Sequence, residues 1–520
     1  MLIFALKPSH DGSIAVIRDR TLVYSVEAEK DSFRRFSSVN VQTILDMAQH
    51  VDQLPDVVAL GGWNRGAMRG SIGAGYHGID ALTRRPTRFF GKEVTFFSSS
   101  HERSHLMMAL GMAPRGEHPL QTVLVWEGAT GAFYLVNEHF EVVKHIPVLT
   151  EPGSRFSFLF ALADPTFPDQ GAPPRLSDAG KLMALAAYAD AQDADADITS
   201  AIDRLLKIDT VYPAPKKEFR DSVLYNAGVE SQETKAAAAL LSRRIFECFA
   251  DVAREQLPSG APLRISGGCG LNCDWNAAWA DLGHFSSVFV PPCTNDSGSA
   301  IGTGIDALTA MTGAPFIDWD VYSGLDFVHD TQPSPDRWER APLDRRALAR
   351  TLAQGHVVAW VQGRWEIGPR ALGNRSLLAE PFRPETKDLL NSIKQREGYR
   401  PIAPCCRVED VDKLFDRAFE DPHMLYFRRV RPSSGIAAVT HVDGSARVQT
   451  VSRRDNQELH ELLSAVADEQ GAGVLCNTSL NFNGHGFINR MSDLIHYCEI
   501  RGIPDMVVGN LWYRARPRAS

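Results

Sequence analysis

The stretch that decides the fold is residues 1–27, MLIFALKPSHDGSIAVIRDRTLVYSVE. Its apolar runs are separated by short polar turns and predict strands at 2–6, 13–18 and 22–26. Strands joined by connections this short lie side by side, so the pattern predicts a β-meander. The first turn, Ser9-His10-Asp11-Gly12, carries two side chains with useful chemistry, His10 and Asp11.

The rest of the first 300 residues alternates between strand and helix patterns. Apolar runs predict further strands at 57–60, 94–97, 122–126, 263–266 and 288–290. Apolar residues at helical spacing predict helices at 41–51, 104–112 and 234–255. Residues 150–232 are rich in Pro, Ala and Asp and predict an insertion of short helices and loops. The alternation predicts an α/β layer fold.

The length of the chain requires more than one core. A chain of 520 residues with 44% hydrophobic residues is too long for one domain, because single cores stop growing near roughly 250–300 residues. Residues 326–343 are polar and carry several prolines, as expected of a linker. A second α/β unit begins after it with a strand at 357–361. We therefore predict domains at 1–325 and 344–520.

Charge and composition exclude several classes of protein. The net charge is −8 and Lys and Arg do not run together, which argues against a nucleic-acid partner. No apolar run approaches the roughly 18 residues that cross a bilayer, and the N-terminus predicts a strand, so neither a membrane span nor a signal peptide is expected. The eight cysteines form no C-x-x-C pair. A cytoplasmic protein with reduced thiols is expected.

Two histidines and two acids form a candidate metal site. His101 and His105 are four residues apart in a helical pattern, so both imidazoles lie on one face and can bind one cation. Glu127 directly follows a strand, and Asp296 lies in a turn of small residues that lets the backbone approach a ligand. This ligand set suits Fe²⁺, Mn²⁺ or Zn²⁺. The alternative is that the histidines are structural and the acids cap helices.

Positively charged residues are concentrated in the last third of the chain, among glycine, proline and apolar residues. Converging guanidinium groups match the oxygens of phosphate, so we predict a site for a triphosphate or an acyl phosphate. The predicted residues are Arg364, Arg370, Arg375, Lys394, Arg396, Arg400 and Arg447, with Asn477 and Ser479 after a strand at 473–475. The alternative is a set of salt bridges to structural acids.

A second candidate for phosphate binding is Gly267-Gly268-Cys269-Gly270-Leu271-Asn272, between a predicted strand and a helix beginning near Asp274. Backbone N–H groups at such a junction can bind phosphate, which makes Gly267, Gly268 and Asn272 candidates. The stretch matches neither the dinucleotide-binding nor the P-loop motif, so a simple tight turn is the equal alternative.

Taken together, these motifs resemble the O-carbamoyltransferases of antibiotic and nodulation-factor biosynthesis. The similarity follows the family's order along nearly the whole chain: Ser9-His10-Asp11-Gly12, His101-x-x-x-His105, Gly180-Lys181-Leu182, Gly267-Gly268, Asp296-x-Gly298, Gly368-Pro369-Arg370, Lys394-x-Arg396 and Cys476-Asn477-Thr478-Ser479. The resemblance implies an N-terminal actin-like ATPase domain, similar to the transferase that makes threonylcarbamoyladenosine in tRNA. It also implies a C-terminal α/β domain of the adenylate-forming, YrdC-like type.

The resemblance further implies an ATP-dependent reaction in two steps. In the C-terminal domain, carbamoyl phosphate and ATP, with Mg²⁺, give carbamoyl-adenylate. The residues matched to that step are Arg370, Arg375, Lys394, Arg400, Arg447 and Ser479, with Arg370 and Lys394 as catalytic candidates. In the N-terminal domain, a metal held by His101, His105 and Asp296, expected to be iron, polarises the carbamoyl carbonyl. His10 and Asp11 then act on the acceptor hydroxyl.

One position departs from the family pattern. The family has Asp-Gly where this chain has Trp126-Glu127-Gly128, so the longer Glu127 is an open fourth ligand. Lys30-Asp31-Ser32-Phe33 and Gly61-Gly62-Trp63 look most like the members that carbamoylate a 3-hydroxymethylcephem in cephamycin biosynthesis. The oligomeric state is left open, with a homodimer among the alternatives.

Three other functions compete with this one. A tRNA threonylcarbamoyladenosine transferase would need a basic surface, which the charge of −8 disfavours. A small-molecule kinase of the actin-like superfamily would release ADP rather than AMP and pyrophosphate. A catalytically inactive nucleotide sensor would not need the full set of Arg, Lys and His side chains.

Overall fold

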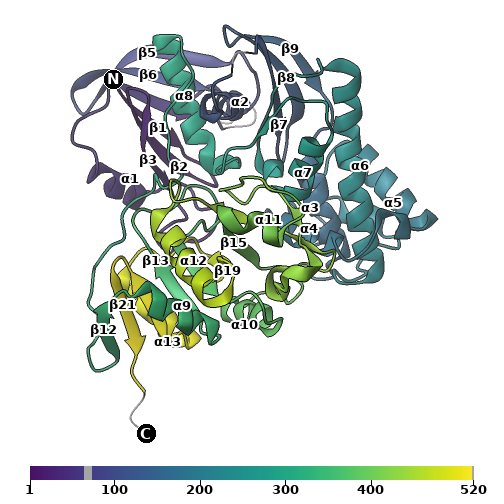
Figure 1. Cartoon of the computed structure of the whole chain (residues 1–520). Helices are drawn as coiled ribbons and strands as arrows, with labels where there is room; N and C mark the ends of the chain where they lie inside the picture. Colours follow the sequence, from purple (N-terminus) through teal and green to yellow (C-terminus); the bar gives the residue numbers. More distant parts are fainter. Residues whose placement is uncertain (64–72, 117, 518–520) are drawn as a thin grey trace. The chain divides into compact units, whose positions relative to one another are not determined.

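The computed structural model describes residues 1–63, 73–116 and 118–517 (Figure 1). The chain forms two compact units, Met1–Met112 with Asp296–Ser520, and Ala113–Asn295. Sheets and helices alternate in both units, so the predicted α/β class is confirmed. No helix in the described ranges is long and apolar enough to cross a bilayer. The domain boundaries predicted from the sequence stay a prediction.

The first sheet is built from the N-terminal meander, as predicted. Its strand order is β3-β2-β1-β4-β6-β5, and β1, β2 and β3 pair antiparallel while β4 and β6 continue in parallel. The predicted strands are confirmed with longer bounds in most cases, and the edge strand β5 was not predicted. The strands are β1 (Leu2–Lys7), β2 (Ser13–Arg18), β3 (Thr21–Glu27), β4 (Val57–Gly61), β5 (Leu82–Phe89) and β6 (Lys92–Ser99).

Two helices stacked on this sheet approach each other closely. Helix α8 (Ser299–Thr312) covers β1, β2 and β4, and α2 (His101–Met112) packs on α8. A Cβ atom at Gly302 of α8 would lie 1.9 Å from the backbone oxygen of Ser104 in α2. Only glycine fits at this crossing, which brings the start of α8 to the two histidines of α2.

The opposite face of the sheet is covered by α1 (Val41–Ala48) and by residues from the last third of the chain. Ile14 and Val16 of β2 share a buried cluster with Trp365, Ala371 and Phe487. The two separate chain segments of this unit are therefore joined by a common hydrophobic core.

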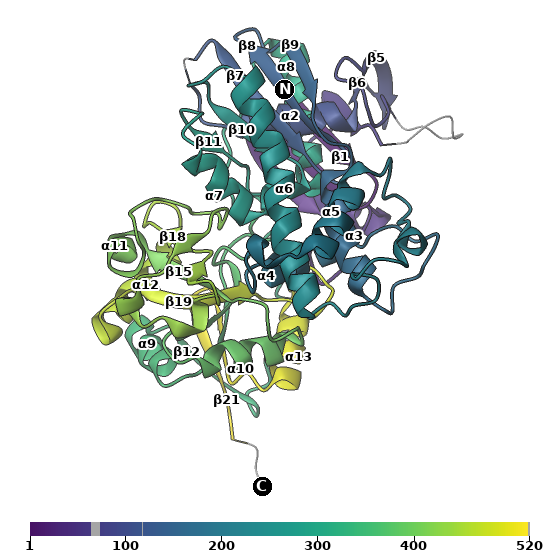
Figure 2. The ribbon, with the colours of Figure 1, turned by 90° about the vertical axis from the view of Figure 1, so that its right-hand side faces the viewer.

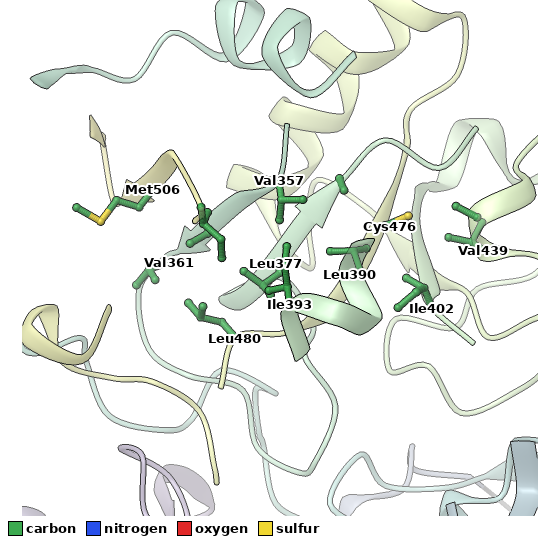
Figure 3. Packing of buried hydrophobic residues seen from close by; sticks show 14 of the residues in the cluster. Val357, Val361, Leu377, Leu390, Ile393, Ile402, Val439, Cys476, Leu480 and Met506 are labelled. Atoms are coloured by element: carbon green, nitrogen blue, oxygen red, sulfur yellow. The ribbon is translucent and has the colours of Figure 1, made fainter. Parts of the chain in front are cut away.

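The last third of the chain forms an eight-stranded sheet with the order β12-β21-β20-β13-β14-β19-β15-β18. Side chains of β13 alternate between two cores, with Ala359 on the face covered by α10 and α13 and Trp360 on the face covered by α9 and α12. Figure 3 shows the first of these cores, where Leu390 and Ile393 of α10 lie near Leu377 of β14. This alternation produces a helix–sheet–helix sandwich.

The elements of the sandwich are β12 (Trp338–Pro342), α9 (Arg345–Ala353), β13 (Val358–Val361), β14 (Arg375–Ala379), α10 (Glu385–Lys394), β15 (Ala403–Arg407), β18 (Gln449–Val451), α12 (Gln457–Gln470), β19 (Val474–Ser479), α13 (Met491–Arg501), β20 (Asp505–Val508) and β21 (Leu511–Ala515). β12 falls within the predicted linker 326–343 and pairs with β21. The strand predicted at 473–475 is too short, because β19 pairs with β14 as far as Ser479. Asn477 and Ser479 therefore lie within a strand rather than after one.

The second unit repeats the plan of the first sheet. Its order is β9-β8-β7-β10-β11, with β7, β8 and β9 antiparallel and β10 and β11 parallel to β7. This repetition accords with the actin-like architecture expected for the N-terminal part. The strands are β7 (Leu120–Trp126), β8 (Gly131–Asn137), β9 (Val142–Pro147), β10 (Leu263–Ser266) and β11 (Val288–Phe289).

Helices of the second unit gather around the long helix α6, as Figure 2 shows. The predicted insertion at 150–232 is confirmed as short helices joined by loops, and the predicted helix at 234–255 is confirmed as α6. The helices are α3 (Pro152–Ala163), α4 (Asp178–Ala186), α5 (Ala196–Lys207), α6 (Gln232–Gln256) and α7 (Cys273–Asp281).

The close crossing of α2 and α8 predicts that adding one methyl group at Gly302 lowers the stability of the protein. We expect Gly302→Ala to lower the free energy of unfolding by about 2 kcal/mol or more, because the added methyl group meets a backbone carbonyl that cannot move alone. Gly180→Ala in α4 is the matched control, since a Cβ atom there meets nothing within 4 Å. Urea unfolding of both variants measures the difference, and equal stabilities would contradict the packing argument.

Candidate active site

The first candidate site is a cluster of His101, His105 and Asp296. The Nε2 atoms of the two histidines are 3.2 Å apart, and Asp296 Oδ1 lies 3.5 Å from His101 Nε2 and 3.3 Å from His105 Nε2. The histidines are 1% and 0% exposed and Asp296 is 8% exposed. The structure therefore brings together three predicted ligands, two from helix α2 and one from the turn before α8.

The geometry of this cluster fits a divalent metal ion. Ligand atoms 3.2–3.5 Å apart are spaced as they would be around a single ion with bonds of about 2.0–2.2 Å. Two imidazoles and one carboxylate are a donor set that iron, manganese and zinc accept, with positions left for substrate. Glu127, the predicted fourth ligand, follows β7 in the other unit and is 3% exposed. Its place in the ligand set stays a prediction.

Lys7 is a functional candidate that sequence reasoning missed. Its ammonium group lies 3.1 Å from Asp296 Oδ2, donates to the backbone carbonyl of His10 and stands 4.3 Å from the ring centre of Trp63. Burial alone would raise the pKa of Asp296, but Lys7 and the two imidazoles outweigh it and hold the pKa well below its ordinary value. The available sequence signal was a lysine at the end of an apolar strand, and the structure shows that its side chain is 1% exposed.

His10 and Asp11 lie beside the metal-ligand cluster, in the β1–β2 turn as predicted. His10 Nδ1 is 2.9 Å from Asp11 Oδ2 and 3.9 Å from Asp296 Oδ2. The His10 side chain is 39% exposed, whereas the side chains of Asp11 and Asp296 are 9% and 12% exposed. An accessible imidazole held by a carboxylate can orient or take a proton from an approaching hydroxyl.

The second candidate site is a group of cations in the last third of the chain. Burial, together with the charges of Arg396 and Arg400, holds the pKa of Lys394 well below its ordinary value. Burial, then Arg400 and Arg447, lowers the pKa of Arg396 to about 9. These four predicted residues therefore lie within electrostatic reach of one another, and an anion bound among them would relieve their repulsion.

Arg35 also acts on this group and was not predicted. Its charge contributes to the lowered pKa values of Lys394 and Arg400, after the larger effect of burial. Arg35 follows β3 in the N-terminal segment and lies 3.6 Å from Glu29. Arg34 and Arg35 stand in a polar loop far from the other cations in the sequence, so no local pattern indicates such a role.

The end of β19 contacts the same cluster through Ser479, whereas Asn477 of this strand bonds to other residues. The Lys394 ammonium donates to the backbone carbonyl and side-chain oxygen of Ser479 and to Asn481. Asn477 donates to the carbonyl of Ala371, next to Arg370, and to Gln449. Arg370 is half-buried in the loop that leads into β14.

Two predicted arginines are engaged elsewhere. All five N–H groups of Arg375 donate to protein oxygens, those of Gln362, Gly363, Asn374 and Asn489. Arg364 donates to the backbone carbonyls of Val23, Ser323 and Gly324. Burial lowers the pKa of Arg375 to about 10. This geometry favours structural roles, and phosphate contacts by these two residues stay predictions.

The glycine-rich stretch of the second unit forms the tight turn that the sequence suggested. Gly267 has a φ of +105°, and a Cβ atom there would lie 2.3 Å from the carbonyl oxygen of Trp126. Asn272 caps α7 by accepting from the backbone N–H groups of Asp274 and Trp275. A Cβ atom at Gly268 would meet nothing within 4 Å. Phosphate binding by this stretch stays a prediction.

Fold and site together define a two-unit α/β protein with a buried His-His-Asp cluster and a separate cluster of cations. Comparison with known proteins gives its family. A family model described as the carbamoyltransferase N-terminus matches residues 88–305, and one described as the carbamoyltransferase C-terminus matches residues 349–515. The chain belongs to the carbamoyltransferase family and is a transferase.

Relatives match along the whole chain. It is 66% identical over 516 residues to 3'-hydroxymethylcephem-O-carbamoyltransferase of Amycolatopsis lactamdurans and equally to that of Streptomyces clavuligerus, covering 99% of this chain and 99% of each relative. It is 33% identical over 550 residues to Nodulation protein U of Rhizobium tropici, covering 94% of this chain and 92% of that protein. The resemblance predicted from the motifs is therefore confirmed.

The metal-ligand cluster predicts the effect of removing one imidazole. We expect His101→Ala and His105→Ala to lose bound divalent metal, because two remaining ligands hold an ion far more weakly than three. Metal content after equilibration with Fe²⁺, Mn²⁺ or Zn²⁺ and desalting measures this. His139→Ala, at a position 73% exposed, is the matched control. Unchanged metal content in His105→Ala would contradict the assignment.

The cation cluster predicts stabilisation by a polyanion. We expect inorganic pyrophosphate to raise the Tm of the protein by about 2–4 °C relative to chloride at equal ionic strength, since the bound anion offsets repulsion between the buried Lys394 and its partly exposed arginine neighbours. Arg396→Ala should lose most of this shift. Arg454→Ala, at an arginine 81% exposed, should keep it. Equal shifts in both variants would show that the effect is not local to the cluster.

Proposed function

We propose that this chain is an ATP-dependent O-carbamoyltransferase that moves a carbamoyl group from carbamoyl phosphate to the hydroxyl of a 3-hydroxymethylcephem. The assignment of the acceptor rests on the 66% identity over 99% of the chain to two relatives that are named for this acceptor. The match covers 516 of the 520 residues and so extends over both candidate sites. The Lys30–Phe33 and Gly61–Trp63 segments, which suggested this acceptor from the sequence, lie within it.

In the first half reaction, the cluster of Lys394, Arg396, Arg400 and Arg447 binds ATP, with Mg²⁺, and carbamoyl phosphate. Water converts the donor to carbamate and phosphate, and a carbamate oxygen attacks the α-phosphorus of ATP. The bond from that phosphorus to the β-phosphate oxygen breaks, and pyrophosphate leaves. Arg370 stabilises the charge that develops on the phosphoryl oxygens. Neighbouring cations fixed by the fold suit this chemistry because they need no reorganisation during the reaction.

In the second half reaction, the acceptor hydroxyl attacks the carbamoyl carbon of the adenylate, and AMP leaves. A divalent ion held by His101, His105 and Asp296 would supply a Lewis acid for the carbonyl oxygen, with iron as the expected metal. His10 takes the proton of the hydroxyl, and Asp11 orients its ring through the 2.9 Å contact. Lys7 keeps Asp296 charged and in place through their 3.1 Å ion pair.

The two half reactions predict separable losses of activity. His105→Ala should abolish carbamoylation of the cephem while pyrophosphate release from ATP and carbamoyl phosphate continues, because the two steps use different clusters. Arg370→Ala should instead slow pyrophosphate release by at least about 100-fold. Mass spectrometry of the acceptor and a pyrophosphate assay measure the two steps.

The products also separate the proposal from its rivals. Release of ADP with a phosphorylated acceptor would identify a kinase. Transfer to an unrelated hydroxylated acceptor, with no mass gain of one carbamoyl unit on the cephem, would leave the family intact and overturn the acceptor.

A further inference from the structure

A buried ion pair from the N-terminal segment forms hydrogen bonds with Gly368, in the turn that carries Arg370. Glu27 Oε1 accepts from the backbone N–H of Gly368 at 2.6 Å, and Lys30 Nζ donates to the backbone carbonyl of Gly368 at 2.7 Å. Lys30 Nζ also lies 3.7 Å from Glu27 Oε2. The two side chains are 3% and 1% exposed. Both backbone polar groups of one glycine are thus held by charged side chains more than 330 positions away in the sequence.

Stability alone does not account for this pair. Removing two charges from water costs several kcal/mol per ion, and a well-packed apolar replacement is often as stable or more so. What an apolar pair could not do is fix the direction of the Gly368 backbone. Gly368 has a φ of +85°, and the Lys30 ammonium is confined further by the ring of Phe487, whose centre is 3.6 Å away.

The backbone direction at Gly368 constrains the position of Arg370. Only Pro369 separates the two residues, and its ring fixes its φ at about −65°, which leaves the backbone between them little freedom. On the other side of Arg370, Ala371 is anchored in the core shared with β1 and β2. Arg370 therefore projects from a short loop that is fixed at both of its ends.

The same ion pair is tied to the turn that carries His10. Glu27 ends β3 and pairs with Ser13 of β2, and the backbone N–H of Ala28 donates to the carbonyl of Gly12 at 2.8 Å. One short segment, 27–30, thus contacts the His10-Asp11-Gly12 turn through its backbone and the Arg370 loop through its side chains.

We propose that Glu27 and Lys30 are positioning residues that hold Arg370 in the orientation required for the first half reaction. This inference rests on the proposed function. The pair touches no reacting atom and acts through the Gly368 backbone. It makes the N-terminal segment a necessary part of the adenylate-forming site.

Steady-state kinetics of pyrophosphate release test this role. Lys30→Met is expected to lower kcat at least about 10-fold with the KM for ATP changed less than about 2-fold, since a displaced arginine loses contacts made in the transition state. In an Arg370→Ala background, assayed with enzyme in excess, Lys30→Met should cost less than about 2-fold more. If the combined variant instead lost kcat by the product of the two single losses, Lys30 would act independently of Arg370 and the positioning role would be wrong.

A double variant that lacks both charges is the control for a loss of stability. Lys30→Met leaves Glu27 buried and unpaired, which lowers Tm, whereas Glu27→Gln with Lys30→Met leaves no unpaired charge. We expect the double variant to recover the Tm of the wild type and not its kcat. Recovery of both would show that the pair is merely structural.

A variant at a distant ion pair completes the experiment. Arg407→Met removes one of the two cations that pair with the buried Asp410, Arg407 at 2.8 Å and Lys413 at 2.6 Å, and should lower Tm without the selective loss of kcat. A wild-type protein that releases no pyrophosphate from ATP and carbamoyl phosphate would overturn the proposed function, and the positioning role falls with it. An active wild type with multiplicative losses overturns the positioning role alone.

Discussion

The close contact of α2 with α8 is the constraint on which the metal-ligand cluster depends. His101 and His105 are on one helix, and Asp296 lies in the short turn before the other, so their convergence requires the two backbones to approach at Gly302. Any larger residue would push α8 away from α2. The small residues that follow Asp296 are therefore a packing requirement first, and the chemistry of the carboxylate follows from it.

Buried charge is used in two different ways in this protein. At the first site, Lys7, Asp296 and the imidazoles offset one another, so the cluster is stable before any ligand binds. At the second, Lys394 and its neighbouring arginines repel one another, and burial lowers their pKa values further. A site of the second kind gains most from a polyanion, which agrees with its predicted ligand.

The sequence predicted the parts that local patterns control. Strand bounds in the meander follow from apolar runs and turns, and the shared face of His101 and His105 follows from helical spacing. The contact of His105 with Asp296 spans 191 positions, so the sequence could offer Asp296 as a candidate ligand but no local pattern could show that the two side chains meet. The concentration of arginines in the sequence predicted a phosphate site, but it could not show that the guanidinium group of Arg375 is fully bonded to protein oxygens. Lys7 was missed because it ends a strand that otherwise looks apolar.

The interrupted course of the first unit has a consequence for the newly made protein. Residues 113–295 are contiguous, so their unit has all of its residues once position 295 has left the ribosome, whereas the first unit also needs residues 296–520. Until α8 emerges, the apolar face of the meander that it covers is open to misassociation. A chaperone that shields this face on the nascent chain would protect the first unit until its second segment is made.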